Sequence, residues 1–360
     1  MHGPPGHNGP PHPHHHHHHS DAELAALRTG DTLLVTALFP VSSSRHLAAH
    51  DQTRLTALLS SVASDIVLYT PDFLAPLVST LRPASLLLHV NTSFAALTAL
   101  PPFERIGADV LQDATSRAAV ELAKPYFVSA AAHQFRAKGY KYVLWVDPDA
   151  FATGHAYHKW PDADRLEETL AKTKAGDAVE GLLMSVHYAP STHFMVWKPM
   201  DGPLSGMMAE TSLFGGSRTS VEWYARAFYA YLDYWKERGE LSRTGRDVHN
   251  ALLFLYSNRF ATVWPADYNA PGARLSASAL ESALGYCGDQ QFYAQFFLAS
   301  ESEKRHMNFA WQDEWHLMFW RSRRPCRDTR AQDATSMLTS MFSDWKPPLG
   351  FLQIPQTTWV

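Results

Sequence analysis

Short runs of apolar residues alternate with longer amphipathic stretches along this chain from about residue 31 onward. The apolar runs 33–38, 66–69 and 86–90 have the length of buried strands, and the stretches 52–62 and 73–81 between them have the spacing of helices. Strands that alternate with helices in this way form parallel sheets with right-handed crossover connections. The first part of the chain therefore predicts an α/β fold with a mostly parallel, Rossmann-like central sheet flanked by helices.

The same alternation continues toward residue 264. Pro125–Lys138 predicts a helix, with Pro125 in its first turn and Gly139 as its C-terminal stop, directly before an apolar strand at 142–146. The segment Ser212–Ser217 carries two glycines and is interpreted as a turn before the next helix. The remaining predicted elements are helices at 164–174, 219–238 and 247–256 and strands at 181–188 and 260–264.

Composition divides the chain into three regions. Residues 1–30 start with Gly, Pro and His almost throughout, including six histidines at His14–His19, and this composition predicts a disordered segment. Residues 31–325 hold the predicted strands and helices and form the predicted domain, which ends in a helical region. Residues 326–360 predict an extended C-terminal tail packed on that domain.

Overall composition narrows the classes of partner. The chain has 360 residues, 46% hydrophobic and 18% charged, with a formal net charge of −4 and no long basic stripe, so we expect a globular protein that does not bind nucleic acid. No run reaches the roughly 18 apolar residues of a membrane span. Two cysteines, Cys287 and Cys326, are too few for a disulfide framework, and the sequence leaves open whether they pair. Asn91-Thr-Ser is a glycosylation sequon that matters only in a secretory lumen.

The strongest candidate for chemistry is the end of the strand at 142–146, where two aspartates, Asp147 and Asp149, flank a proline. Open α/β sheets bind ligands at the carboxyl ends of their strands, and carboxylates are the ligands that Mg²⁺ and Mn²⁺ prefer. The pair therefore predicts a divalent cation that also holds a diphosphate, with Asp149 as its direct ligand. Asp147 is expected to reach the ribose hydroxyls or to bind the metal through water. Asp-Pro-Asp is also ordinary turn chemistry, which remains the alternative.

Other polar residues could complete such a site, and each has a structural alternative. The backbone of Gly215 and Gly216 could let a sugar or phosphate approach closely, and Lys124 could meet a phosphate or pair with a carboxylate. Asp247 is a candidate catalytic base, or simply an N-cap. His249 is the predicted third metal ligand, with His187 and His193 as alternatives, although a lone histidine is more often a structural polar group.

Taken in order, several segments resemble the HtrL/YibB-like family of proteins, over roughly residues 31 to 320. The segments are Leu33-Leu-Val-Thr-Ala-Leu-Phe, Asp65-Ile-Val-Leu-Tyr-Thr70, Lys124-Pro-Tyr-Phe, Val143-Leu-Trp-Val-Asp-Pro-Asp149, Leu213-Phe-Gly-Gly-Ser-Arg and Gly245-Arg-Asp-Val-His-Asn250. The resemblance implies a GT-A-like catalytic domain, a nucleotide-sugar donor and a divalent cation. Two departures are Val248, where relatives often carry Gln, and Asp149, since relatives frequently have only the first aspartate.

These observations predict a metal-dependent glycosyltransferase that uses a nucleotide-diphosphate sugar, Mn²⁺ or Mg²⁺, and an unknown glycan, protein or lipid acceptor. The alternatives are a catalytically silent member that binds a nucleotide sugar or a protein, and a phosphotransferase of the haloacid-dehalogenase type, which carries its aspartate pair on the first strand. Many HtrL/YibB-like proteins are anchored in a secretory membrane. We therefore expect a Golgi or other secretory lumen if the full-length protein has an anchor, and a soluble protein otherwise.

Overall fold

The computed structural model describes residues 20–28, 30–39, 49–92, 100–106, 116–151, 155, 157–173, 181–188, 190–240, 244–265, 267, 284–288, 290–316, 324–350 and 352–356. The histidine run His14–His19 lies outside these residues, as does most of the segment predicted to be disordered. Within that segment, residues Asp21–Ala26 form helix α1, which begins with a capping box between Ser20 and Glu23.

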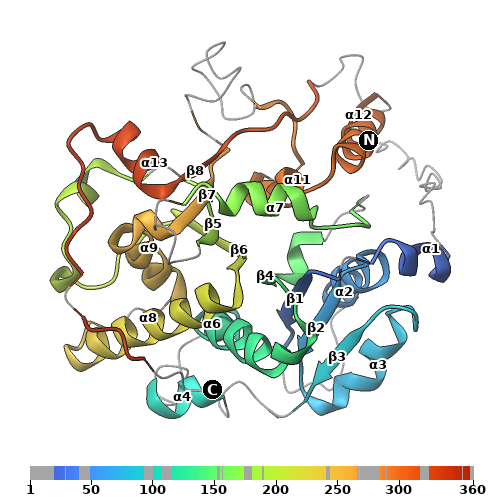
Figure 1. Cartoon of the computed structure of the whole chain (residues 1–360), viewed down its shortest axis with the longest axis horizontal. Coiled ribbons are helices and arrows are strands. Elements are labelled where there is room, and N and C mark those ends of the chain that lie inside the picture. Colours follow the sequence, from blue (N-terminus) through green and yellow to red (C-terminus); the bar gives the residue numbers. More distant parts are fainter. Residues whose placement is uncertain are drawn as a thin grey trace, which may run out of the picture.

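The centre of the molecule is an eight-stranded sheet with the strand order β3-β2-β1-β4-β6-β5-β7-β8 (Figure 1). Strands β1 to β5 and β7 run in one direction, and β6 and β8 run in the other. The strands are β1 Thr32–Ala37, β2 Asp65–Tyr69, β3 Leu88–Asn91, β4 Tyr142–Val146, β5 Leu182–Val186, β6 Ala209–Gly216, β7 Phe260–Val263 and β8 Ala331–Asp333. The predicted class, a mixed α/β fold with a mostly parallel central sheet, is confirmed.

Helices cover both faces of the sheet, because successive side chains of a buried strand point to opposite faces. In β4, Val143 and Trp145 pack with α6, α8, α9 and α13, whereas Leu144 and Val146 pack with α2, α3, α7, α11 and α12. The helices are α2 Ala49–Ser61, α3 Ala75–Thr80, α4 Pro101–Ile106, α6 Ser116–Gln134, α7 Ala163–Leu170, α8 Arg218–Glu237, α9 Gly245–Leu255, α11 Tyr293–Phe297, α12 Glu301–His316 and α13 Ala334–Met341.

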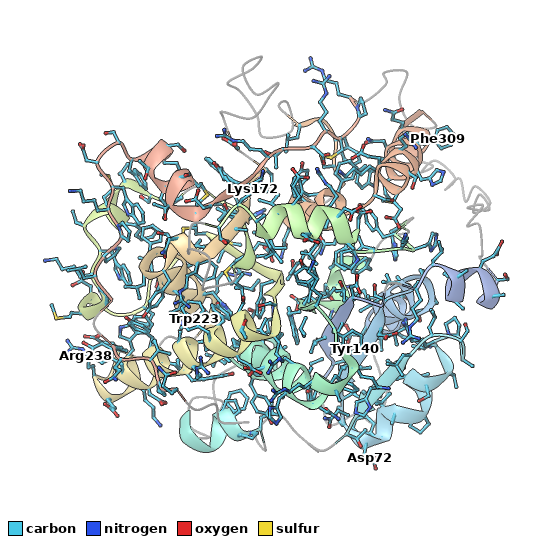
Figure 2. The ribbon with its side chains drawn as sticks, viewed as in Figure 1. Asp72, Tyr140, Lys172, Trp223, Arg238 and Phe309 are labelled. Atoms are coloured by element: carbon cyan, nitrogen blue, oxygen red, sulfur yellow. A yellow bond between two sulfur atoms is a disulfide. The ribbon has the colours of Figure 1, made fainter. Side chains whose placement is uncertain are left out.

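The side chains fill the space between these layers (Figure 2). Trp145, Trp160 and Trp235 are fully buried, so the large aromatic content of the chain is mainly core. Phe309, labelled on α12 in Figure 2, is instead largely exposed. The molecule is therefore a three-layer arrangement in which the two helical layers have separate hydrophobic cores.

Three predictions about elements need correction. The segment interpreted as a turn, Ser212–Ser217, lies mostly within strand β6, and α8 begins immediately after it with Ser217 as N-cap. The predicted extended tail contains β8 and α13. Helix α6 begins at Ser116, so Pro125 lies in its interior and not in its first turn.

A neighbouring side chain accommodates the proline inside α6. A proline in a helix removes one backbone hydrogen bond and crowds the preceding turn. Beside Pro125, the Tyr229 hydroxyl accepts the N–H of Tyr126 at 3.2 Å and donates to the carbonyl of Leu122 at 2.9 Å. These two groups are four residues apart and would bond directly in a regular helix. The phenol of α8 therefore bridges the helix where proline disturbs it.

Candidate functional site

The two aspartates lie at the carboxyl edge of the sheet, where its strand order changes direction. From β1 the chain proceeds outward to β2 and β3, and then returns to place β4 on the other side of β1. The carboxyl ends of β1 and β4 thus meet at a topological switch point, where open α/β sheets usually bind their ligands. Asp147 follows β4 directly, and Asp149 lies in the short 3₁₀ helix Pro148–Phe151.

The structure fixes Asp147 through all of its polar groups. Its backbone N–H donates to the carbonyl of Ser212 at 2.8 Å, which extends the pairing of β4 with β6. Its Oδ1 accepts from Trp145 Nε1 at 2.7 Å, and its Oδ2 accepts from Lys124 Nζ at 3.0 Å. The carboxylate therefore has a single defined orientation, with 22% of its side chain exposed.

Lys124 is the buried cation beneath this edge, with a side chain only 1% exposed. Besides Asp147, its ammonium bonds to the Glu121 carboxylate and to the carbonyl of Thr211 at 3.0 Å. Thr211 Oγ1 in turn donates to Glu121 Oε2 at 2.7 Å. Two roles were predicted for Lys124, an ion pair with a carboxylate and contact with a phosphate. The structure shows the ion pair, and the burial of the lysine leaves it no access to a phosphate in this arrangement.

The pKa shifts of the cluster follow from burial and from one another. Burial lowers the pKa of Lys124, but Asp147 and Glu121 more than compensate, and the net pKa is raised. Burial raises the pKa of Asp147, and Lys124 only partly opposes it. The pKa of Glu121 is lowered, because Lys124 and its hydrogen bonds outweigh burial. The cluster is therefore a charged Lys–Glu pair with an aspartate whose acidity is weakened.

Asp149 is about as exposed as Asp147 but is held differently. Its Oδ1 accepts from Arg54 Nη1 of α2 at 2.8 Å, and the two side chains are 23% and 31% exposed. Partly exposed ion pairs of this kind contribute little to stability, so a ligand of higher charge can displace the guanidinium at small cost. Asp149 thus has the chemistry and the access expected of a direct ligand to a divalent cation.

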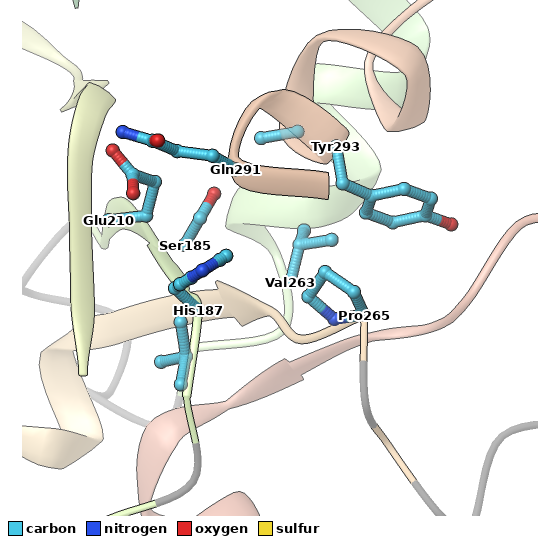
Figure 3. A pocket seen from close by; sticks show the side chains of 9 residues that line it. Ser185, His187, Glu210, Val263, Pro265, Gln291 and Tyr293 are labelled. Atoms are coloured by element: carbon cyan, nitrogen blue, oxygen red, sulfur yellow. The ribbon is translucent and has the colours of Figure 1, made fainter. Parts of the chain in front are cut away.

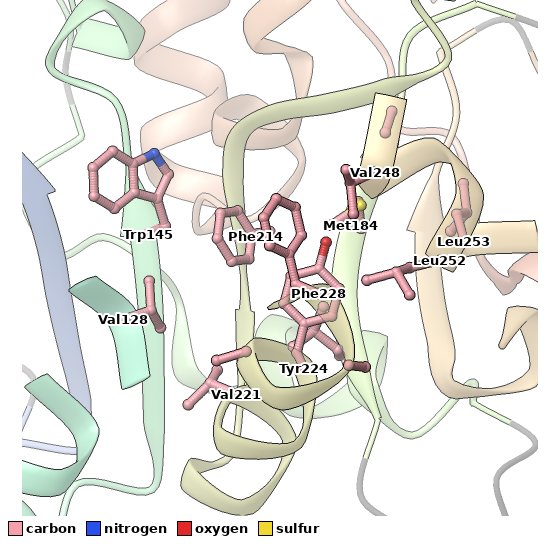
Figure 4. Packing of buried hydrophobic residues seen from close by; sticks show 14 of the residues in the cluster. Val128, Trp145, Met184, Phe214, Val221, Tyr224, Phe228, Val248, Leu252 and Leu253 are labelled. Atoms are coloured by element: carbon pink, nitrogen blue, oxygen red, sulfur yellow. The ribbon is translucent and has the colours of Figure 1, made fainter. Parts of the chain in front are cut away.

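His249 does not join the two aspartates, and the prediction that it is a metal ligand is wrong. It is fully buried on α9, where its Nδ1 shares a hydrogen bond with the Tyr224 hydroxyl and its ring packs against Phe214 and Phe228. Figure 4 shows Phe214, Tyr224 and Phe228 close together in this core. Among the described residues, no group of three or more His, Cys, Asp or Glu side chains is arranged to hold a metal ion.

Gly215 and Gly216 also lie away from the aspartates, which corrects the prediction that they line a sugar site. Because β6 is antiparallel to β4, Gly216 pairs with Val143 at the start of β4, whereas Leu213 pairs with Val146 at its carboxyl end. A Cβ on Gly215 would lie 2.2 Å from the carbonyl oxygen of Val143. The two glycines are required by close packing of strands and not by a ligand.

The other predicted site residues, Asp247, His187 and His193, lie in different parts of the fold. Asp247 is half-buried in the first turn of α9, and its backbone carbonyl accepts from the N–H of Leu204 at 3.2 Å. His187 directly follows β5, at the same edge of the sheet as Asp147, and its ring packs against Tyr188. His193 lies in a 3₁₀ helix farther along, and its side chain is outside the described part of the chain.

The position of the aspartate pair also bears on the phosphotransferase alternative. In that class the pair ends the first strand, whereas here β1 ends at Ala37 and is followed by Leu38 and Phe39. Asp147 and Asp149 follow the fourth strand along the chain. The topology is therefore not the one that this alternative requires.

Several residues at this edge were not found by sequence reasoning. Glu121 stands one helical turn before Lys124, a spacing that could have indicated an ion pair. No sequence pattern connects Arg54 with Asp149, because Arg54 lies on α2, 95 residues earlier in the chain. Glu210 is the second residue of β6, a strand that was not predicted, and with Ser185 it lines a pocket between β5, β6 and β7 (Figure 3). Burial raises the pKa of Glu210 despite a hydrogen bond from the N–H of Ser212.

Comparison with known proteins finds similar solved structures but no similar sequence. No family model matches the sequence, and no curated protein matches it. Among solved structures, the fold is similar to that of mouse xyloside xylosyltransferase 1 in its apo form, with 12% sequence identity, a TM-score of 0.39, and coverage of 65% of this chain and 85% of that chain. A likeness at this level does not indicate what the present chain binds. Membership of this chain in the HtrL/YibB-like family therefore stays a prediction from sequence motifs.

Proposed function

We propose that this protein is a glycosyltransferase that moves a sugar from a nucleotide-diphosphate donor to an acceptor, as a GT-A-like member related to the HtrL/YibB-like proteins. The observation that carries the proposal is the position of Asp147 and Asp149 at the carboxyl end of β4, beside the switch point between β1 and β4. Open α/β sheets commonly bind nucleotides at such a switch point. Two carboxylates there suit a ligand that has both hydroxyl groups and a metal-bound diphosphate.

The two aspartates would have different roles, because different side chains hold them. Asp147 is fixed by Trp145 and Lys124, so it would accept hydrogen bonds from ribose hydroxyls or from water on a cation. Asp149 would exchange Arg54 for a bound Mn²⁺ or Mg²⁺. Such a cation, when bound, would neutralise the negative charge that develops on the departing diphosphate. Asp247 remains the proposed base or acceptor-orienting residue.

The test is thermal unfolding of the protein with UDP or GDP, each with and without Mn²⁺, compared with Asp149→Asn. We expect one nucleotide to stabilise the protein in the presence of Mn²⁺, by about 2.7 kcal/mol at 100 times its Kd, and the variant to lose this effect. The histidine run is the same in both proteins, so any Mn²⁺ that it binds cancels from the comparison. If no nucleotide raises the midpoint at millimolar concentration, the donor site does not exist.

A second candidate is a silent protein that binds a nucleotide sugar without transferring it. The observation that favours it is that each aspartate already has a cationic partner within the chain, Lys124 for Asp147 and Arg54 for Asp149, so neither needs a metal to be paired. A silent binder would be stabilised by nucleotide yet release no nucleoside diphosphate from any nucleotide sugar. Measuring that release with and without a broad acceptor mixture separates the two functions.

A further inference from the structure

Arg246, in the first turn of α9, differs from the other cations at the carboxyl edge of the sheet. Lys124 is only 1% exposed and is bound to two carboxylates, and Arg54 is bound to Asp149. The Nε of Arg246 is buried without a hydrogen-bond partner, and its guanidinium forms no ion pair within the part of the chain that the structure describes. Arg246 is therefore a cation of this edge that no group of the protein uses.

The packing of α9 fixes where Arg246 lies. This helix packs against α6, α8 and β6. Its first residue, Gly245, lies so close to α6 that an added Cβ would be 2.7 Å from the carbonyl oxygen of Glu121. The backbone carbonyl of Asp247 accepts from the N–H of Leu204, in the connection between β5 and β6, at 3.2 Å. The first turn of α9 is thus held between α6 and that connection, beside the cluster of charges at the edge.

The electrostatics of neighbouring groups agree with this position. Burial raises the pKa of Glu210, and the positive charge of Arg246 is among those that oppose it. Burial lowers the pKa of His249, and Arg246 contributes to the same shift. Glu210 Oε1 accepts the N–H of Ser212 at 3.0 Å, and the carbonyl of Ser212 accepts the N–H of Asp147 at 2.8 Å. Arg246 therefore lies near the part of β6 that is bonded to the proposed donor-binding aspartate.

A nucleotide diphosphate would bring negative charge to an edge that already carries several carboxylates, so it needs a cation that can face it. A guanidinium is well suited, because its planar set of N–H donors matches two phosphate oxygens at once. Arg246 is partly exposed, unlike Lys124, so a ligand can reach it. It also has no ion pair that a ligand would have to break.

We propose that Arg246 binds the phosphate groups of the donor. This inference rests on the proposed glycosyl transfer and deepens it, because it assigns the phosphate-binding cation that sequence reasoning placed at Lys124. The guanidinium would hold the diphosphate from the side of α9, and the cation proposed at Asp149 would hold it from the side of β4.

The experiment measures how much affinity the phosphates add. Calorimetric titrations compare uridine with UDP and guanosine with GDP, each with and without Mn²⁺, and a further titration uses inorganic pyrophosphate without metal. The proteins are the wild type, Arg246→Gln and Arg246→Lys. The matched control is Arg226→Gln, because Arg226 also has a buried Nε without a partner, but it lies on α8 and donates to the carbonyl of Gln356 at 3.2 Å.

We expect one diphosphate to bind more tightly than its nucleoside, and this gain to fall about tenfold or more in Arg246→Gln. Arg246→Lys should show an intermediate loss, because it keeps the charge but not the planar set of donors, and Arg226→Gln should bind like the wild type. Without ligand, the unfolding midpoint of Arg246→Gln should stay close to that of the wild type, because no bond within the protein is lost. If Arg246→Gln does not fold, the loss in Arg246→Lys decides.

The outcomes separate this inference from the proposed function. If a nucleotide binds but its phosphates add no affinity, or add as much in the Arg246 variants as in the wild type, the inference is overturned and the donor site stands. If pyrophosphate binds and depends on Arg246 while no nucleotide binds, the phosphate site stands and the proposed function fails. If neither nucleotide nor pyrophosphate binds, both fail.

Discussion

Lys124 connects two carboxylates from different parts of the chain, Glu121 one turn earlier on α6 and Asp147 after β4. The lysine is almost fully buried, so both interactions act in an environment of low dielectric constant, where a missing partner is costly. Its position makes it a structural support for Asp147. The orientation of the proposed donor-binding carboxylate therefore depends on a residue that does not itself reach the ligand.

Replacing Lys124 by Met should destabilise the protein by about 3 kcal/mol, because two partly buried carboxylates lose their buried cation. Urea unfolding at neutral pH measures the loss. The matched control is Lys141→Met: both partners of the Lys141–Glu167 ion pair are exposed, so this substitution should change the free energy of unfolding far less. Equal effects of the two substitutions would contradict the role assigned to Lys124.

His249 predicts a pH dependence. Burial lowers its pKa from the usual 6.5 to about 3, against the opposing effect of the Glu121 carboxylate. As the pH falls, His249 therefore binds a proton near pH 6.5 in the unfolded chain but only near pH 3 in the folded protein. The contribution of this residue to stability is complete above pH 6.5 and is lost as the pH falls from 6.5 toward 3, by about 1.4 kcal/mol per pH unit.

His249→Gln removes this titration and tests the prediction. The free energy of unfolding of the wild type should fall more steeply between pH 6.5 and 4 than that of the variant, even if the variant is less stable at neutral pH. The other histidines are common to both proteins and cancel in the difference of slopes. Parallel pH profiles would mean that the pKa of His249 is the same in the folded and unfolded states, which would contradict the prediction.

At the scale of elements, β6 determines how the site is built. It is antiparallel to both of its neighbours, β4 and β5, and it joins the edge that carries Asp147 to the pocket that contains Ser185. Its C-terminal glycines allow close approach of the adjacent backbones. Gly215 has a φ of +152°, a conformation that residues with side chains rarely adopt.

Gly215→Ala should therefore destabilise the protein by about 3 kcal/mol, since the new methyl group overlaps the Val143 carbonyl and the backbone is strained. Thermal or urea unfolding measures it. Gly139→Ala is the control, because Gly139 also has a positive φ, +75°, but open space around it, and it should cost only about 1 kcal/mol. A similar loss in both variants would leave only backbone strain as the cause.

Most elements were predictable because their signals are local. The strands at 142–146 and 260–264 and the helix at 219–238 agree with β4, β7 and α8 to within about a residue at most ends. Strand β6 was not predicted, because its two glycines indicate a turn when they are considered without the neighbouring strands. Strand β8 has only three residues and is defined by its pairing with β7, so no local sequence pattern predicts it.

For the whole molecule, the C-terminal third is tied together by a disulfide between Cys287 and Cys326, whose Cα atoms are 4.8 Å apart. The sequence had left this pairing open. The bond encloses α11 and α12, and α11 carries Tyr293 and Ala294, which line the small pocket between β5, β6 and β7. Among the described residues, no helix has the length and hydrophobicity needed to cross a membrane.

Reducing this disulfide, or replacing both cysteines by serine, should lower the free energy of unfolding by about 4 kcal/mol, the value expected from loop-closure entropy for a separation of 39 residues. Urea unfolding with and without dithiothreitol measures the effect. The double serine variant serves as the control, because reductant should leave it unchanged. Insensitivity of the wild type to reductant would show that the bond contributes no stability.

The sequence by itself determined what depends on neighbours along the chain: the α/β class, most helices and strands, and the placement of Asp147 and Asp149 at a strand end. Hydrophobic periodicity and turn chemistry act over a few residues, so a single chain displays them. The tertiary structure decided which groups meet across the fold. Lys124 and Arg54 reach the aspartates, His249 enters an aromatic core, and Glu210 and Ser185 share a pocket. These relations depend on strand order and helix packing, which bring together residues that local patterns treat as independent.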